Sequence, residues 1–130
     1  MLLKRILLVF VLAGLLLAGN GCAPSFVSSD AGVYSTGTLY AVTKGDITSV
    51  YGATLAAMEK LEIEVTDKAK DVFYAKVVAR GADGKRITVR IKPGVGDLID
   101  FNIRVGTLGD EHRSRMIYEQ IQKNLGGGRK

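Results

Sequence analysis

The chain has 130 residues, with 18 lysines and arginines against 13 aspartates and glutamates, a formal net charge of +5, and one cysteine. Lys4, Arg5, Arg129 and Lys130 lie near the two ends, so the part between them is close to neutral and a nucleic-acid-binding class is not favoured. The length leaves room for one small domain, and the single cysteine excludes an internal disulfide.

The N-terminal segment has the layout of an export signal. Two basic residues, Lys4 and Arg5, precede an apolar run at 6–18, and small residues then lead to Cys22. The run has the length of a signal-peptide hydrophobic region and is short for a membrane span. We expect residues 1–21 to be a signal peptide, with a transmembrane anchor as the alternative.

The segment that ends at Cys22 resembles the signal of bacterial lipoproteins, in which a cysteine receives acyl chains. That family usually has a leucine three residues earlier, where this chain has Gly19, and Gly19 and Gly21 also suit ordinary signal-peptidase cleavage. The resemblance implies a lipid anchor on Cys22, which several acyl chains would make almost irreversible. Ala23 and Pro24 lack the aspartate of enterobacterial inner-membrane retention, which favours the outer membrane facing the periplasm.

Composition divides the rest of the chain into three parts. Residues 22–37 are rich in serine, alanine and glycine, which is typical of a flexible tether. Residues 126–130 are glycine-rich and basic, and we expect them to form a flexible tail. Residues 38–125 carry the apolar periodicity of a single folded domain.

The domain begins with an alternating segment, 38–44, that predicts a strand. Gly45 interrupts it, and Asp46 is suited to cap a helix from Ile47 to about Leu61. The apolar face of this helix is formed by Val50, Ala53, Thr54, Ala57, Met58 and Leu61.

Strict alternation of apolar and polar residues predicts four further strands. Their common inward face is formed by Ile63, Val65, Phe73, Ala75, Val77, Ala79, Ile87, Val89, Ile91, Ile99, Phe101, Ile103 and Val105. The loop at 81–85 predicts a hairpin with Gly84 in the left-handed position. The loop at 93–97 predicts a second hairpin that pairs Ile91 with Ile99.

These two hairpins bring three arginines together on the outer face of the sheet. Arg86 is expected opposite both Arg80 and Arg104. The cluster is the least neutralised part of the sheet and suits an anionic headgroup, a glycan acid or an acidic partner. The alternative is a solvated strand face that discourages aggregation at the sheet edge.

A second helix is predicted from Asp110, its N-cap, to about Leu125. Its apolar stripe is formed by Ser114, Ile117, Ile121 and Leu125. The expected fold is therefore α+β in two layers, in the order β-α-β-β-β-β-α. An antiparallel sheet of about five strands would carry two helices on one face.

Several segments of the domain carry a specific pattern, at 37–39, 50–55, 61–66, 82–85 and, most specifically, 103–111 with Ser114. In these segments the chain resembles a small bacterial lipoprotein family known only as a domain of unknown function, DUF 3568. The element order is also similar to the helix-grip domains of outer-membrane assembly lipoproteins. The first resemblance implies an envelope lipoprotein without an established activity, and the second is an analogy of fold alone.

The domain offers little for catalysis. His112 is the only histidine, and Ser114, two positions further on, does not share its helix face. No set of histidines, cysteines and carboxylates has metal-ligand spacing, and we expect no cofactor.

We therefore interpret the protein as a non-catalytic binding or scaffold module for envelope protein partners, anchored through Cys22. The alternative is recognition of anionic phospholipid headgroups or cell-wall glycan by Arg80, Arg86 and Arg104. An enzyme is the least favoured class.

Overall fold

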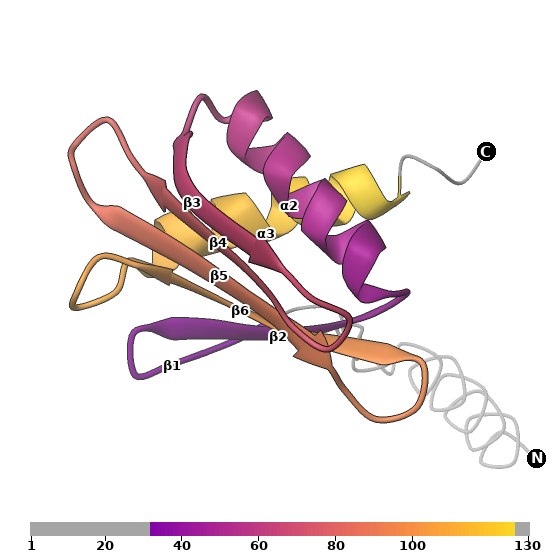
Figure 1. The fold of residues 1–130 in the computed structure, drawn as a ribbon. Coiled ribbons are helices and arrows are strands. Elements are labelled where there is room, and N and C mark those ends of the chain that lie inside the picture. Colours follow the sequence, from indigo (N-terminus) through magenta and orange to yellow (C-terminus); the bar gives the residue numbers. More distant parts are fainter. Residues whose placement is uncertain (1–31, 127–130) are drawn as a thin grey trace, which may run out of the picture.

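A computed structural model of the chain describes residues 32–126; the predicted signal peptide at 1–21, residues 22–31 of the predicted tether with Cys22, and residues 127–130 of the predicted tail at 126–130 lie outside the described residues. Six antiparallel strands form one sheet in the order β1-β2-β6-β5-β4-β3, and both helices cover the same face of it (Figure 1). The elements are β1 (Val33–Ser35), β2 (Thr38–Lys44), α2 (Ile47–Lys60), β3 (Glu64–Lys70), β4 (Ala75–Arg80), β5 (Arg86–Pro93), β6 (Leu98–Val105) and α3 (Glu111–Gly126). The α+β class and the predicted order are confirmed, with six strands in place of about five.

Both helices begin at the predicted caps. Asp46 accepts a hydrogen bond from the backbone N–H of Ser49 at 2.7 Å, and Asp110 accepts one from the backbone N–H of Arg113 at 3.1 Å. The bond from Ser49 lowers the pKa of the Asp46 carboxyl. The helices contact each other, α2 also contacts β4 and β5, and α3 contacts β6 and β2. Within residues 32–126 neither helix combines the length and hydropathy needed to cross a bilayer.

The inward face predicted from alternation forms the core. Most of its large apolar side chains are withdrawn from water, and burying each contributes roughly 1.5–3 kcal/mol. The largest fully buried side chains come from the two helices and the four central strands: Leu39, Val50, Met58, Val77, Ile87, Val89, Ile91, Phe101, Ile103, Val105, Ile117 and Ile121.

Phe73 is the exception, since its side chain is 75 % exposed rather than buried. The cause is a tight turn in which the backbone N–H of Asp71 donates to the carbonyl of Tyr74 at 2.6 Å. The Asp71 carboxylate also accepts from the N–H of Val72 at 2.6 Å. β4 therefore starts at Ala75, and the prediction that Phe73 continues its inward face is wrong.

β1 is a strand that the composition did not indicate, and it lies inside the range 22–37 expected to be a tether. It pairs with β2 through a two-residue turn in which Thr36 and Gly37 have φ angles of +49° and +82°. Two positive φ angles are the signature of a type I′ hairpin turn. The sequence signal is weak because threonine stands where asparagine is the usual residue.

The register of the sheet follows one prediction and departs from the other. Ala79 pairs with Ile87, as expected. In the second hairpin Ile91 pairs with Phe101 instead of Ile99, a shift of two residues. A shift of two keeps every side chain on its predicted face, because side-chain direction alternates with a period of two. It does, however, change every cross-strand neighbour between β5 and β6.

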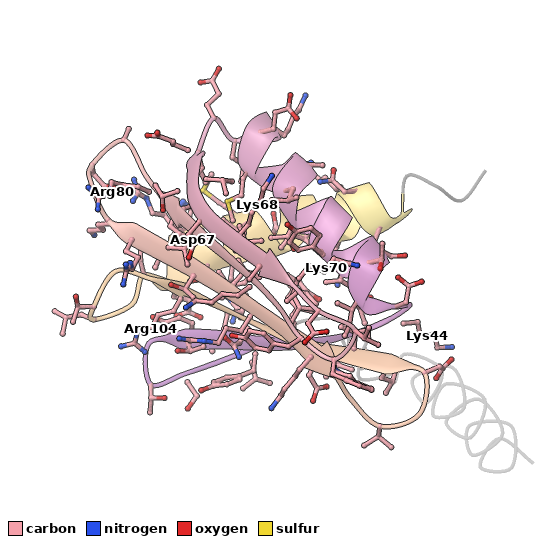
Figure 2. The ribbon with its side chains drawn as sticks, viewed as in Figure 1. Lys44, Asp67, Lys68, Lys70, Arg80 and Arg104 are labelled. Carbon is pink, nitrogen blue, oxygen red and sulfur yellow. The ribbon has the colours of Figure 1, made fainter. Side chains whose placement is uncertain are left out.

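β3 forms one edge of the sheet and is interrupted by a β-bulge. Its pairing with β4 shifts register at Thr66, which adds one residue to the strand. Beyond the bulge, Lys68 and Lys70 pair with Val77 and Ala75, on the face that carries the helices. Both lysines are exposed at the margin of that face (Figure 2).

The end of α2 is a Schellman motif built on a glutamate. The N–H of Ile63 donates to the carbonyl of Met58 at 2.8 Å, and the N–H of Glu62 donates to that of Glu59 at 3.1 Å. This pattern requires a left-handed residue, usually glycine, at the position after the cap. Glu62 takes it with a φ of +57°.

The change Glu62→Gly is expected to stabilise the domain. Glycine removes the left-handed strain of about 1–2 kcal/mol from the folded state. It also raises the conformational entropy of the unfolded chain, which offsets part of this effect, so the free energy of unfolding should rise by about 0.5–1 kcal/mol. Urea unfolding followed by circular dichroism measures it. Glu59→Gly, three residues earlier on the exposed helix surface, is the control and should cost about 1 kcal/mol. Equal losses in both variants would contradict the assignment.

Candidate functional site

The three arginines predicted to cluster do lie at one end of the sheet. Arg80 is the last residue of β4 and Arg86 the first of β5, and they are direct cross-strand partners. Arg104 lies opposite Thr88 rather than Arg86, because of the shifted register. Figure 2 shows Arg80 and Arg104 on the same side of the molecule, away from Lys44. The predicted contact between Arg86 and Arg104 across the ladder is therefore wrong, although their proximity at this end remains.

A cleft of about 630 Å³ opens beside two of these arginines. It is lined by Gly84, Lys85, Arg86, Thr88, Arg104, Val105, Gly106, Thr107, Leu108 and Gly109. The volume is in the range of small-molecule sites. Arg80 is not among the lining residues. Lys85 does line the cleft, although the sequence did not single it out.

Arg104 is held by the protein itself. One guanidinium nitrogen donates to the carbonyl of Thr36 at 3.1 Å and to the hydroxyl of Thr38 at 3.1 Å, and the other donates to the carbonyl of Thr107. The side chain is half-buried. Arg104 thus links the β1–β2 turn to the loop that follows β6. Much of its hydrogen-bonding capacity is therefore used within the protein and is not available to a ligand.

Two glycines allow that turn and that loop to touch. A Cβ on Gly109 would lie 2.4 Å from the Cα of Gly37 and 2.5 Å from the hydroxyl oxygen of Tyr34. A Cβ on Gly37 would lie 2.9 Å from the carbonyl oxygen of Leu108. We call this contact, with the Arg104 hydrogen bonds across it, the Arg104 junction.

The remaining cations of this end differ in their availability. Arg113, on α3, forms an ion pair of 2.7 Å with Asp83, and that hydrogen bond is the main cause of a lowered pKa of the Asp83 carboxyl. Arg86 and Lys85 are exposed, and within residues 32–126 no hydrogen bond or ion pair engages either side chain. The positive charge that the cleft offers to a ligand therefore comes mainly from Arg86 and Lys85.

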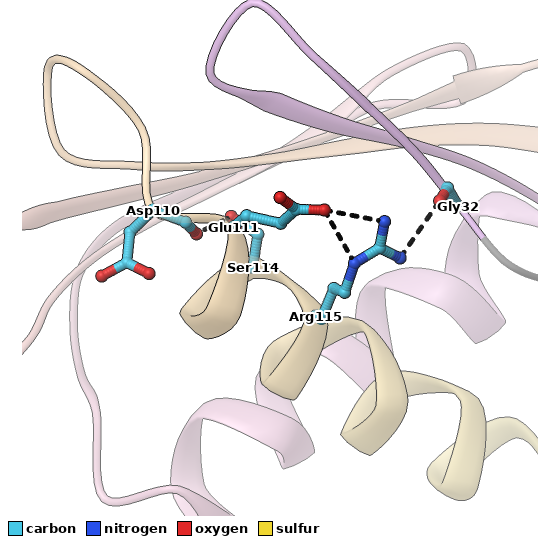
Figure 3. A network of polar contacts seen from close by, with 5 residues as sticks. All are labelled: Gly32, Asp110, Glu111, Ser114 and Arg115. Carbon is cyan, nitrogen blue, oxygen red and sulfur yellow. Dashed lines mark hydrogen bonds and ion pairs between the residues drawn. The ribbon is translucent and has the colours of Figure 1, made fainter.

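The residues weighed for catalysis at the start of α3 are separated by the helix. His112 is exposed, whereas Ser114 is buried and its hydroxyl donates to the carbonyl of Asp110 at 2.7 Å (Figure 3). Arg115 binds Glu111 at 3.0 Å and the carbonyl of Gly32 at 3.3 Å. These contacts tie the helix to its own first turn and to the chain before β1. In the described part of the chain no three potential ligands are grouped to hold a metal ion.

The segments with the most specific sequence pattern meet at the Arg104 junction, where residues 37–39 contact the 103–111 segment. A family model described as "Protein of unknown function (DUF3568)" matches residues 5–124. The chain belongs to this family. No curated protein matches the sequence. Membership of this family gives the DUF3568 protein a kinship but no activity.

Two alanine variants can distinguish the steric effect of the contact between Gly109 and Gly37 from the effect of backbone strain on stability. Gly109 and Gly84 have similar φ angles, +86° and +81°, but nothing lies within 4 Å of a Cβ on Gly84. Gly84→Ala should cost only the left-handed strain, about 1–2 kcal/mol. Gly109→Ala should cost about 1–3 kcal/mol more, because the turn and the loop must separate. Urea unfolding compares them, and equal losses would contradict the junction.

Proposed function

We propose that this DUF3568 protein is a lipid-anchored protein of the bacterial cell envelope, held by acyl chains on Cys22 in the outer membrane and facing the periplasm. The observation that carries this proposal is the position of Cys22. It follows the basic pair, the apolar run at 6–18 and the small residues Gly19 and Gly21, and a short spacer separates it from the domain. Several acyl chains on one cysteine provide a stable anchor.

The domain itself acts as a non-catalytic binding or scaffold module for envelope protein partners. Its support is the cleft beside the Arg104 junction, which is rigid on one side and cationic on the other. The junction fixes the backbone of Thr107–Gly109, while Lys85 and Arg86 extend from the β4–β5 hairpin. Such a site suits an acidic segment of a partner protein, since fixed positive charge attracts carboxylates.

Recognition of an anionic phospholipid headgroup or a cell-wall glycan is the second candidate. The size of the cleft favours it, because an open cleft of about 630 Å³ can accommodate a small anionic group. Two arginines are the relevant donors here, Arg86 directly and Arg80 beside it across the strand pair. Arg104 contributes less, because its guanidinium binds protein carbonyls.

The anchor is tested by replacing Cys22 with serine and expressing the full chain in a bacterium that processes lipoproteins. The parent chain should be cleaved before Cys22, show an intact mass increased by acyl chains, and float with membranes in a density gradient. The Cys22→Ser variant should lose the added mass and the flotation. A parent chain cleaved at the same bond without added mass would refute the lipid anchor.

The role of the cleft is tested by comparing Arg86→Glu with Arg90→Glu. Both arginines are exposed and lie on the same face of β5, but only Arg86 lines the cleft. In crosslinked envelopes Arg86→Glu should reduce partner capture at least about tenfold, the loss of roughly 1.4 kcal/mol, while Arg90→Glu should not. Arg104 is left unchanged because its loss would disturb the junction.

Binding of an anionic phospholipid headgroup or a cell-wall glycan is tested with the Cys22→Ser variant, which removes the lipid anchor. Pelleting with isolated cell-wall sacculi and flotation with anionic vesicles measure binding without the anchor. Binding that Arg86→Glu abolishes and Arg90→Glu preserves would favour the anionic ligand. Equal effects of both substitutions on every readout would contradict a specific role of the cleft.

A further inference from the structure

Two hairpin turns carry apolar side chains that are exposed to solvent. Val72, Phe73 and Tyr74, in the turn between β3 and β4, are 74 %, 75 % and 40 % exposed. Val95, in the turn between β5 and β6, is 86 % exposed. None of these side chains contributes to the core, so the fold itself does not account for them. We call the two turns the apolar tips.

The apolar tips extend from the same end of the sheet. Lys70 at the end of β3 pairs with Ala75 at the start of β4, and Ala75 pairs with Ile91 near the end of β5. The turns at 71–74 and 94–97 therefore point in the same direction, two strand spacings or about 10 Å apart. Figure 1 shows both turns at the end of the molecule opposite the β1–β2 and β4–β5 turns. The Arg104 junction and the cleft are thus remote from the tips.

The length of chain between Cys22 and the first strand limits how far the domain can stand from an anchor on Cys22. β2 runs toward Lys44, beside the tips, and β1 is antiparallel to it, so β1 runs from the tip side toward the Arg104 junction. Cys22 precedes Val33 by eleven residues. This length spans at most about 40 Å. A lipid on Cys22 therefore keeps the domain within this distance of the bilayer, at a high effective concentration.

The charges closest to the tips nearly balance. The strand ends and turns here, with Asp100 opposite Lys92, carry three lysines and four aspartates: Lys44, Lys70, Lys92, Asp46, Asp71, Asp97 and Asp100. Such a set gives no net attraction to an anionic surface. Insertion of the tips would instead be driven by the transfer of apolar surface out of water, and would depend little on salt or lipid charge.

We propose that the apolar tips dock on the phospholipid bilayer that holds the anchor, so that the cleft at the opposite end faces away from the membrane. This inference rests on the proposed lipid anchor. Narrow protruding turns suit insertion between lipid headgroups, and Tyr74 carries the amphipathic ring that membrane interfaces favour. Exposed apolar patches mark either membrane or protein contacts, and the proposed lipid anchor, at most about 40 Å of chain from Val33, favours the membrane.

The experiment uses tryptophan as a unique reporter, because the chain contains none. Full-length lipidated Phe73→Trp, Val95→Trp and Leu108→Trp are each reconstituted into phosphatidylcholine vesicles with or without brominated acyl chains. Leu108 is the control, since it is 91 % exposed but lies beside the Arg104 junction. Bromine should quench tryptophan at 73 and 95 at least about twofold, with blue-shifted emission, and leave tryptophan at 108 unaffected. Added salt or anionic lipid should change neither result.

Each other outcome overturns the inference. Vesicles that carry the protein but quench all three tryptophans equally, or none, would refute docking through the tips while leaving the anchor intact. Blue-shifted emission at 73 without bromine quenching, together with a dimeric mass in detergent, would assign the tips to a contact between two copies. A chain that does not float with vesicles at all would refute the lipid anchor and the docking together.

Discussion

The contact between Gly37 and Gly109 is the constraint on which the remaining arrangement depends. It joins the turn that starts β2 to the loop that starts α3, and Arg104 closes it with donors to both segments. Because β2 and β6 are neighbours under α3, this one contact positions the helix over the sheet and shapes the wall of the cleft. An arginine that resembled a binding residue is therefore first a structural one.

The two ends of the sheet have different chemistry. One end combines a rigid backbone wall with the available cations Lys85 and Arg86, and the other presents apolar side chains among nearly balanced charges. Each strand turn contributes to only one of these ends. A single antiparallel sheet can thus present two surfaces of different chemistry at its opposite ends.

Periodicity in the sequence was sufficient for the class, the order of elements and the core. Alternation placed residues such as Ile87 and Phe101 on the inward face, and Asp46 and Asp110 marked the helix starts. Such features are local, so a single segment contains the information. The candidate site was less accessible, because it depends on contacts between distant segments. Arg104 lies 68 positions from Thr36, and neither residue indicates the other.

The errors arose where turn chemistry decides the structure. The hairpin of β1 and β2 was not predicted, because threonine seldom takes the positive φ angle that Thr36 has in its turn. The second hairpin shifted by two residues, which the apolar pattern cannot detect. Phe73 looked like a core residue by spacing alone until Asp71 closed a turn before it. Its side chain is instead exposed in the turn between β3 and β4.

The bulge in β3 has a consequence for how any partner can bind. An unpaired sheet edge invites another chain to add a strand, but Thr66 distorts this edge and Lys68 and Lys70 place charges beside it. At the opposite edge β1 offers only three residues, too few for a stable ladder. Addition of a strand is therefore disfavoured at β3 and at β1, which limits polymerisation of neighbouring copies through these two strands.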